Sequence, residues 1–211
     1  MPPATAIEIG PEPDAIAPVA PRPRTAWKVW GEIGLCSGYP TQILLGGLLK
    51  DLGIAPLTAD GALSATFVFA LSLADTVLLI ALVSWLLIRN GERPRDVFLG
   101  RRQPRAEATV GVLSVPFVVA LVLVLSLLIR AVMPSLRNVP VNPLAGMLGT
   151  QTGLLAFLFV VIVAGGVREE LQRAFLLHRF RNELGSAGLG LIVTSLAFGL
   201  GHTLQGWDAA I

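Results

Sequence analysis

Residues 110–133, VGVLSVPFVVALVLVLSLLIRAVM, decide the fold class of this chain. Arg130 is the only charged residue in that stretch, and a membrane-spanning helix needs about 20 consecutive apolar residues. Residues 62–88 form a second such stretch, in which Asp75 is the only charged residue. Both stretches therefore predict helices that cross a lipid bilayer.

The composition of the whole chain agrees with a membrane protein. Of its 211 residues, 54% are hydrophobic and 14% are charged, whereas a soluble domain has roughly 25% charged residues. The remaining polar surface is too small to cover a soluble globule. The net charge of +2 comes without a basic face, which argues against nucleic acid as a partner. We expect an all-α fold, a polytopic membrane helix bundle with about five spans.

The chain divides into a tail and one helical domain. Residues 1–26 hold seven of the 15 prolines and no aromatic residue, so they predict a disordered Pro-rich tail. Residues 27–211 are expected to form the transmembrane helical domain. Its expected spans are about 31–49, 62–88, 110–133, 152–167 continuing to about 183, and 186–204. Gly38, Pro40 and a glycine pair interrupt the first stretch, which predicts a bent span or an interfacial helix.

Loop charges predict the orientation. The loops on one side hold three, six and four basic residues, thirteen in all, against one and two on the other. Because basic residues gather on the cytoplasmic side, we expect a multi-pass integral membrane protein of a bacterial-type plasma membrane, with its N-terminus in the cytoplasm. Burial of Arg168 or Arg173 in the protein would weaken this count.

The residues that can carry chemistry begin with Glu169 and Glu170. On a helix Arg173 lies within pairing distance of either glutamate, and the two glutamates point about 100° apart. Taken alone, this segment favours an amphipathic helix with its charges in water. His202 changes that interpretation, because it lies on an apolar, glycine-rich helix.

A turn near Gly185 relates the glutamates to His202. Glu170 comes 15 residues before that glycine and His202 comes 17 residues after it, so both lie roughly 22 to 26 Å from the turn at 1.5 Å per residue. An antiparallel hairpin would place them at one level. Ionisable groups inside a bilayer cost roughly 2.5 to 3.5 kcal/mol or more each, so a matched depth favours a functional role.

These motifs resemble those of the CPBP family of intramembrane proteases, which includes CAAX prenyl endopeptidases and bacteriocin-processing or Abi proteins. The resemblance rests on Glu169-Glu170 with a following arginine, and on Phe198-x-x-x-His202 on the next helix. Two features differ from the family. Its arginine falls one position later, where this chain has Ala174, and its later His-x-x-x-Asn or Asp motif does not occur before Ile211. Either the chain is a fragment whose site is completed by residues beyond Ile211, or its activity is impaired.

The resemblance implies a membrane-embedded endopeptidase whose partners are the lipid bilayer and a peptide or protein substrate, prenylated or not. It implies Glu169 as the base that activates a water, assisted by His202, with Glu170 and Arg173 orienting the site. Zinc is an expected option, held by Glu169 and His202. Since Cys36 is the only cysteine, any metal would need histidine and carboxylate ligands.

A second hypothesis is a non-enzymatic membrane scaffold or transporter subunit that uses the same charges for helix packing. Asp75 fits this hypothesis, because an intramembrane carboxylate can belong to an ion path. Burial of Asp75 against a polar neighbour is the more favoured interpretation of that residue.

Overall fold

The computed structural model describes residues 25–100 and 103–211, and over these residues the chain is α-helical without a β-strand. This confirms the all-α membrane bundle expected from the sequence. Most of the predicted tail, residues 1–24, lies outside the described residues. Its last residue, Ala26, already begins helix α1, Ala26–Leu35.

Three helices of the described chain are long and apolar enough to cross a membrane. These are α3 (Ala65–Arg89), α5 (Pro104–Val132) and α8 (Ala187–Gly201), the last with its short extension to Gln205. They occupy the second, third and fifth predicted stretches. The three helices agree with an integral membrane protein, and whether the other two predicted stretches cross the bilayer stays a prediction.

The first predicted stretch is divided. Helix α1 ends at Leu35, and α2 (Tyr39–Asp51) begins after a break at which Gly38 has φ +90°. A left-handed backbone of this kind suits glycine, which has no Cβ, and Pro40 follows in the first turn of α2, where proline costs no hydrogen bond. The two helices have 10 and 13 residues, so each is shorter than a full span.

The fourth stretch is one continuous helical rod with a change of winding in its middle. It runs through α6 (Gln151–Val160), the π-helix η3 (Val161–Arg168) and α7 (Glu169–Asn182). A π-helix makes i to i+5 hydrogen bonds, is rare, and is frequently found at functional sites. Here it ends immediately before Glu169, so the altered winding sets the direction in which the glutamates point.

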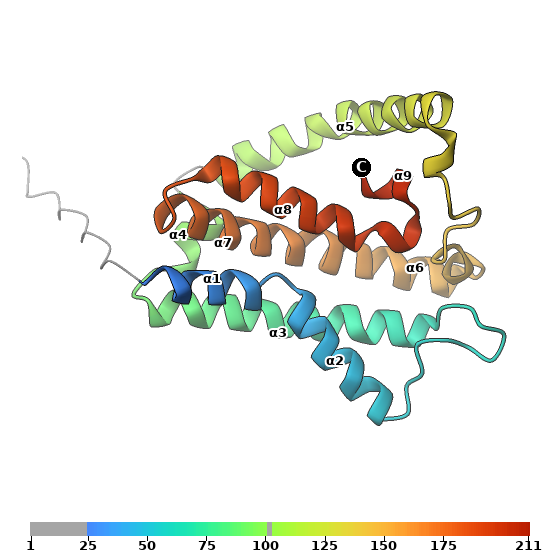
Figure 1. The fold of residues 1–211 in the computed structure, drawn as a ribbon, viewed down its shortest axis with the longest axis horizontal. Helices are drawn as coiled ribbons and strands as arrows, with labels where there is room; N and C mark the ends of the chain where they lie inside the picture. Colours follow the sequence, from blue (N-terminus) through green and yellow to red (C-terminus); the bar gives the residue numbers. More distant parts are fainter. Residues whose placement is uncertain (1–24, 101–102) are drawn as a thin grey trace, which may run out of the picture.

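Helices α7 and α8 form an antiparallel hairpin (Figure 1). The turn contains Gly185 at φ +69°, and the Ser186 hydroxyl accepts from the Leu189 N–H to cap α8. Hairpins of this type pair residues at equal distance from the turn, and the contacts of Phe180 with Gly190 and of Arg173 with Phe198 follow that rule.

The packed core lies where α1, α3 and α7 meet. Its members are Val29, Ile33, Cys36, Leu79, Val83, Leu86, Leu87, Phe175, Leu176 and Phe180. Trp30 adds an edge-to-face ring contact with Phe180 at 5.5 Å between centroids. Since lipid tails are as apolar as leucine, close packing rather than transfer out of water holds such helices together.

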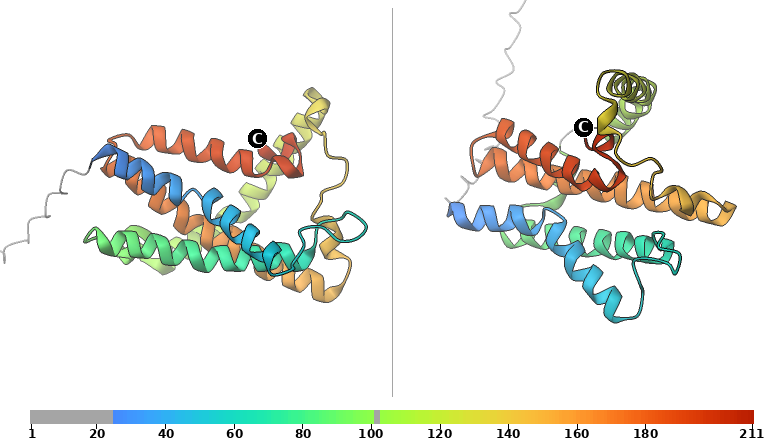
Figure 2. Two further views of the ribbon diagram at one scale, coloured as in Figure 1. Left: turned by 60° about the horizontal axis from the view of Figure 1, so that its bottom comes forward. Right: turned by 45° about the vertical axis from the view of Figure 1, so that its right-hand side comes forward.

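Helix α5 stands apart from this bundle, as Figures 1 and 2 show. None of its most apolar window is buried against other parts of the described chain. Three short helical segments also belong to the connections: α4 (Pro94–Phe98) before α5, and the 3-10 turns Pro134–Leu136 and Ala145–Leu148 after it. At the other end, the turn Thr203–Gln205 and α9 (Trp207–Ala210) follow α8.

Candidate functional site

A cavity of about 230 Å³ lies between the α1–α2 break, α7 and α8. Glu169 from the first turn of α7 and His202 from the end of α8 both line it. A second hollow, which the C-terminal residues 209–211 also line, shares both of these side chains. The structure therefore brings Glu169 and His202 to one site, although 33 residues separate them in the sequence.

The hairpin register explains why these two residues meet. Phe180 and Gly190 each lie five residues from Gly185, and a Cβ built on Gly190 would stand 2.6 Å from the Phe180 Cβ. Further along, Arg173 and Phe198 lie 12 and 13 residues from the turn. Their guanidinium carbon and ring centroid are 5.0 Å apart. Glu169 and His202, at 16 and 17 residues, come one turn later.

The second glutamate has a different environment. The Glu170 side chain is 69% exposed and accepts a 2.6 Å hydrogen bond from Arg173 Nη1, with which it forms an ion pair. It lines neither hollow. Arg173 in turn covers the Phe198 ring, so the Glu170–Arg173 pair contributes to the α7–α8 contact from outside the main cavity.

The hydrogen bonding of His202 fixes which nitrogen carries the proton. Its Nδ1 lies 2.8 Å from the carbonyl oxygen of Phe198, one turn earlier in α8. A carbonyl oxygen can only accept, so Nδ1–H is the donor, and a neutral imidazole then keeps a lone pair on Nε2. His202 can therefore accept a hydrogen bond from water, or bind a metal, through Nε2.

The site does not by itself offer a complete zinc site. A catalytic zinc ordinarily has three protein ligands and one open position. The cavity supplies two candidate donors, Glu169 and His202, and the described residues contain no group of three histidine, cysteine or acidic side chains that could hold a metal. The residues that line the cavity therefore do not fit a catalytic zinc on their own.

Behind Glu169 lies a buried ion pair between Arg168 and Asp75 of α3. Gln42 of α2 also donates to the Asp75 carboxylate, at 3.3 Å. Asp75 is thus buried against polar neighbours, as the favoured interpretation of that residue expected. The Arg168 side chain also lies close to the backbone at the α1–α2 break. A Cβ added at Gly38 would stand 2.6 Å from an Arg168 nitrogen, so this position suits glycine.

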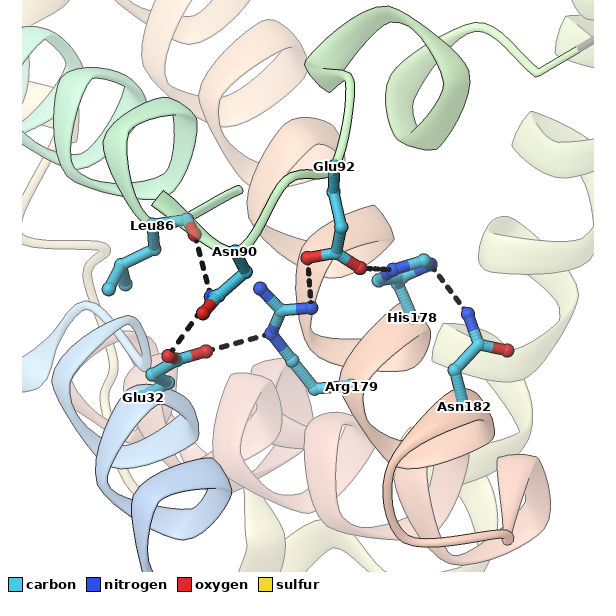
Figure 3. Close-up of polar contacts among 7 residues, drawn as sticks. All are labelled: Glu32, Leu86, Asn90, Glu92, His178, Arg179 and Asn182. Carbon is cyan, nitrogen blue, oxygen red and sulfur yellow. Dashed lines mark hydrogen bonds and ion pairs between the residues drawn. The ribbon is translucent and has the colours of Figure 1, made fainter. Parts of the chain in front are cut away.

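A second polar cluster ties α7 to α1 and to the segment after α3 (Figure 3). Arg179, which is fully buried, donates through Nε to Glu32 at 2.8 Å and through Nη1 to Glu92 at 2.5 Å. Asn182 Nδ2 donates to His178 Nδ1 at 2.9 Å, which leaves His178 Nε2 to donate to Glu92 at 2.5 Å. These charged residues join α7 to α1 and to the segment after α3.

Two basic residues that the sequence analysis counted in a cytoplasmic loop, Arg168 and Arg179, are therefore buried. The count on that side falls from thirteen to eleven against three, so the orientation stays a prediction. The sequence analysis also missed Gln172 and Tyr39. Gln172 donates to the Cys36 carbonyl at 2.8 Å, and the Tyr39 hydroxyl donates to the Ala197 carbonyl at 2.7 Å.

Comparison with known proteins finds a family match for the C-terminal part of the chain. Residues 150–211 match the model of the type II CAAX prenyl endopeptidase Rce1-like family. The match confirms, over these residues, the resemblance to CPBP and CAAX proteases that the motifs predicted. It includes Glu169 and His202 and leaves α1 to α5 outside. No curated protein and no solved structure matches the chain.

Proposed function

We propose that this chain is an intramembrane endopeptidase in which Glu169 activates the attacking water and His202 holds that water in place. One observation carries the proposal: the two side chains come from consecutive helices of the Rce1-like segment and line the same cavity. An acid and a histidine at one depth of a membrane bundle are costly, and a shared cavity gives them access to a reactant.

The chemistry needs a proton acceptor and a positioned water. The Glu169 carboxylate takes one proton from the water while the water oxygen forms a bond to the scissile carbonyl carbon. His202 Nε2 accepts a hydrogen bond from the second water hydrogen, because its Nδ1 is engaged with Phe198. As the tetrahedral intermediate collapses, the C–N bond breaks and protonated Glu169 gives its proton to the leaving amine. The products are a carboxylic acid and an amine.

Glu170 and Arg173 act as positioning residues in this proposal. Their ion pair, together with the contact of Arg173 on Phe198, holds the first turn of α7 against the last turns of α8. Glu169 is then kept on the cavity side. No step uses zinc, since a metal bound by Glu169 and His202 would need further ligands.

The experiment compares the two neighbouring glutamates. Purified protein in detergent is given an internally quenched peptide that ends in a prenylated CAAX sequence, and the same peptide without the prenyl group. Loss of a general base lowers the rate by about 10² to 10⁴-fold, so Glu169→Gln should lose cleavage to that extent. Glu170→Gln is the matched comparison: it keeps an oxygen that can accept the hydrogen bond from Arg173, so it should lose far less activity than Glu169→Gln.

A double variant tests whether Glu169 and His202 act as one unit. His202→Ala should lose activity to a similar extent as Glu169→Gln, and the double variant should lose little more. Cleavage that persists in Glu169→Gln would exclude this mechanism. The assay uses the natural chain with any residues beyond Ile211, and if that protein cleaves neither peptide, the scaffold or transporter hypothesis replaces the peptidase. Comparison of the two peptides decides whether the substrate is prenylated.

A further inference from the structure

The buried ion pair behind Glu169 joins the start of α7 to α3. Asp75 is 2% exposed within α3, and Arg168 is 7% exposed at the last position of the π-helix η3. Arg168 Nη2 donates to the Asp75 carboxylate. Because Arg168 directly precedes Glu169, the pair holds the residue next to the proposed base.

A second contact, one helical turn later, acts on the same side of α7. Gln172 is fully buried and donates to the Cys36 carbonyl at 2.8 Å. A Cβ added at Gly38 would stand 2.6 Å from Arg168 Nη2 and 3.1 Å from Gln172 Nε2. Arg168 and Gln172 therefore both lie against the backbone of the α1–α2 break.

Helical geometry relates this anchored face to the two glutamates. Successive residues of an α-helix point about 100° apart, so residues four positions apart, such as Arg168 and Gln172, point within about 40° of each other. From the Arg168 direction, Glu169 is turned by about 100° and Glu170 by about 200°. The structure agrees, since Glu169 lines the cavity and the Glu170 side chain is 69% exposed. Holding the face of Arg168 and Gln172 therefore holds Glu169 in the cavity.

The π-helix before α7 gives α7 an alternative rotation. A π-helix places one more residue in each hydrogen-bonded turn than an α-helix does, and η3 separates α6 from α7. Rewinding η3 by one residue as α-helix would rotate α7 by about 100° relative to α6. Glu169 would then point where Glu170 points now, away from the cavity. The ion pair lies at the last residue of η3, where it can oppose this rotation.

A buried ion pair is better suited to fixing a rotation than to adding stability. The cost of removing two charges from water offsets most of their attraction, and apolar residues of similar size are often equally stabilising. The best-supported role of buried ionic groups is to fix register. The Glu170–Arg173 pair lies at the surface, where an ion pair is a weak constraint. The Asp75–Arg168 pair adds a buried constraint beside it.

We propose that Asp75 is a positioning residue of the candidate site: through Arg168 it fixes the rotation of α7, so that Glu169 rather than Glu170 shares the cavity with His202. Its effect on catalysis rests on the proposed peptidase function, whereas the rotation of α7 does not. Asp75 lies in α3, outside the residues that match the Rce1-like family. The site then depends on a helix that the family match leaves out.

The first experiment measures the rotation and needs no cleavage. Two cysteine pairs are made in the natural chain with Cys36→Ser: Glu169→Cys with His202→Cys, and Glu170→Cys with His202→Cys. Each is treated with a short bifunctional thiol reagent. The pair at 169 and 202 should crosslink more completely, because Glu169 and His202 line one cavity. Equal crosslinking of the two pairs would overturn the inference at once.

The Asp75→Leu, Arg168→Met double variant separates rotation from stability. Since both charges are removed together, its melting temperature should return toward the wild-type value. The crosslinking preference for position 169 over position 170 should nevertheless disappear. Asp75→Asn keeps the shape of the side chain and removes its charge. It provides a second variant, in which the preference should be reduced.

Thr76→Val is the matched control for a buried polar residue of α3. Thr76 is buried directly after Asp75, and its hydroxyl donates to the Ser72 carbonyl within the same helix at 2.7 Å. The substitution therefore removes a buried hydrogen bond that does not reach α7. It should leave both the crosslinking preference and kcat within about twofold of wild type.

Peptide cleavage by the natural chain gives the second measurement. A misplacement of about 1 Å can cost about 10²-fold in rate, so the double variant should lose kcat by about that factor while KM and the melting temperature stay near wild type. An ion pair that only stabilises the fold predicts the opposite, because kcat would then recover together with the melting temperature.

Two results in the double variant would overturn the inference. One is a crosslinking preference for position 169 that persists without the ion pair. The other is a wild-type kcat in the stable double variant. If the natural chain cleaves neither peptide, the peptidase function fails, and crosslinking alone decides whether Asp75 fixes the rotation of α7.

Discussion

Gly190 of α8 lies directly against Phe180 of α7, and this contact sets the register of the hairpin that carries the candidate site. A Cβ built on Gly190 would stand 2.6 Å from the Cβ and 2.8 Å from the Cγ of Phe180. Phe180 is fully buried, so its ring cannot move aside into solvent. A larger residue at position 190 must therefore push the two helices apart.

Gly190→Ala is expected to destabilise the protein by about 1 to 3 kcal/mol, the usual cost of overpacking. It should also reduce peptide cleavage, because the displacement reaches Glu169 and His202. Gly188→Ala is the control: nothing lies within 4 Å of its added Cβ. Thermal unfolding in detergent measures both variants. A Gly190→Ala protein as stable as Gly188→Ala would show that the contact does not set the register.

The Arg168–Asp75 pair should behave as a buried ion pair. Removing one partner leaves an unpaired charge inside the bundle, so Asp75→Leu alone should cost about 3 to 5 kcal/mol. Arg168→Met added to it should recover part of that loss, because both charges are then gone. Urea or heat unfolding of the single and double variants measures the coupling. If the double variant loses the sum of the two single losses, the residues do not act as a pair.

Much of the fold could be predicted from the sequence, because long apolar stretches have few alternatives in a bilayer. Counting residues on each side of Gly185 predicted that His202 lies as far from the turn as the glutamates do. The structure has Glu169 and His202 lining one cavity. That Glu169 rather than Glu170 faces the cavity required the structure, since the helical angle alone leaves either glutamate free to do so.

Other features depended on contacts between distant segments. Asp75 and Arg168 are 93 residues apart, and no periodicity relates them. Arg179 was counted as a loop charge because its two acidic partners, Glu32 and Glu92, lie outside the segment that carries it. The π-helix before Glu169 had a local signal only in the Gly165–Gly166 pair, and a glycine pair alone does not predict a change of winding.

The cluster around Glu92 predicts a loss of stability in acid. Burial raises the pKa of this carboxyl, but the hydrogen bonds from His178 and Arg179 outweigh that effect and hold the pKa below its ordinary value of 4.5. A carboxyl with a lowered pKa in the folded state stabilises the protein above its unfolded pKa, and this contribution is lost as the pH falls through the folded value. The melting temperature should therefore fall below about pH 4.5.

Glu92→Gln should flatten this part of the pH profile, because the amide does not titrate. Glu170→Gln, which changes an exposed carboxyl, should leave the profile unchanged. Melting temperatures from pH 7 to pH 3 in a non-ionic detergent provide the comparison. A Glu92→Gln profile with the same slope as wild type would assign the acid sensitivity to another group.

The last prediction concerns orientation. Residues 89–105, which connect α3 to α5, hold six basic residues and do not include Arg168 or Arg179, so we expect this segment in the cytoplasm. Gln103 lies exposed within that segment and is replaced by cysteine in a Cys36→Ser background. A membrane-impermeant thiol reagent should label it only after the cells are permeabilised. A cysteine at Leu57, exposed in the connection between α2 and α3, provides the opposite case and should react in intact cells. Labelling at position 103 but not at position 57 in intact cells would invert the predicted orientation of α3 and α5.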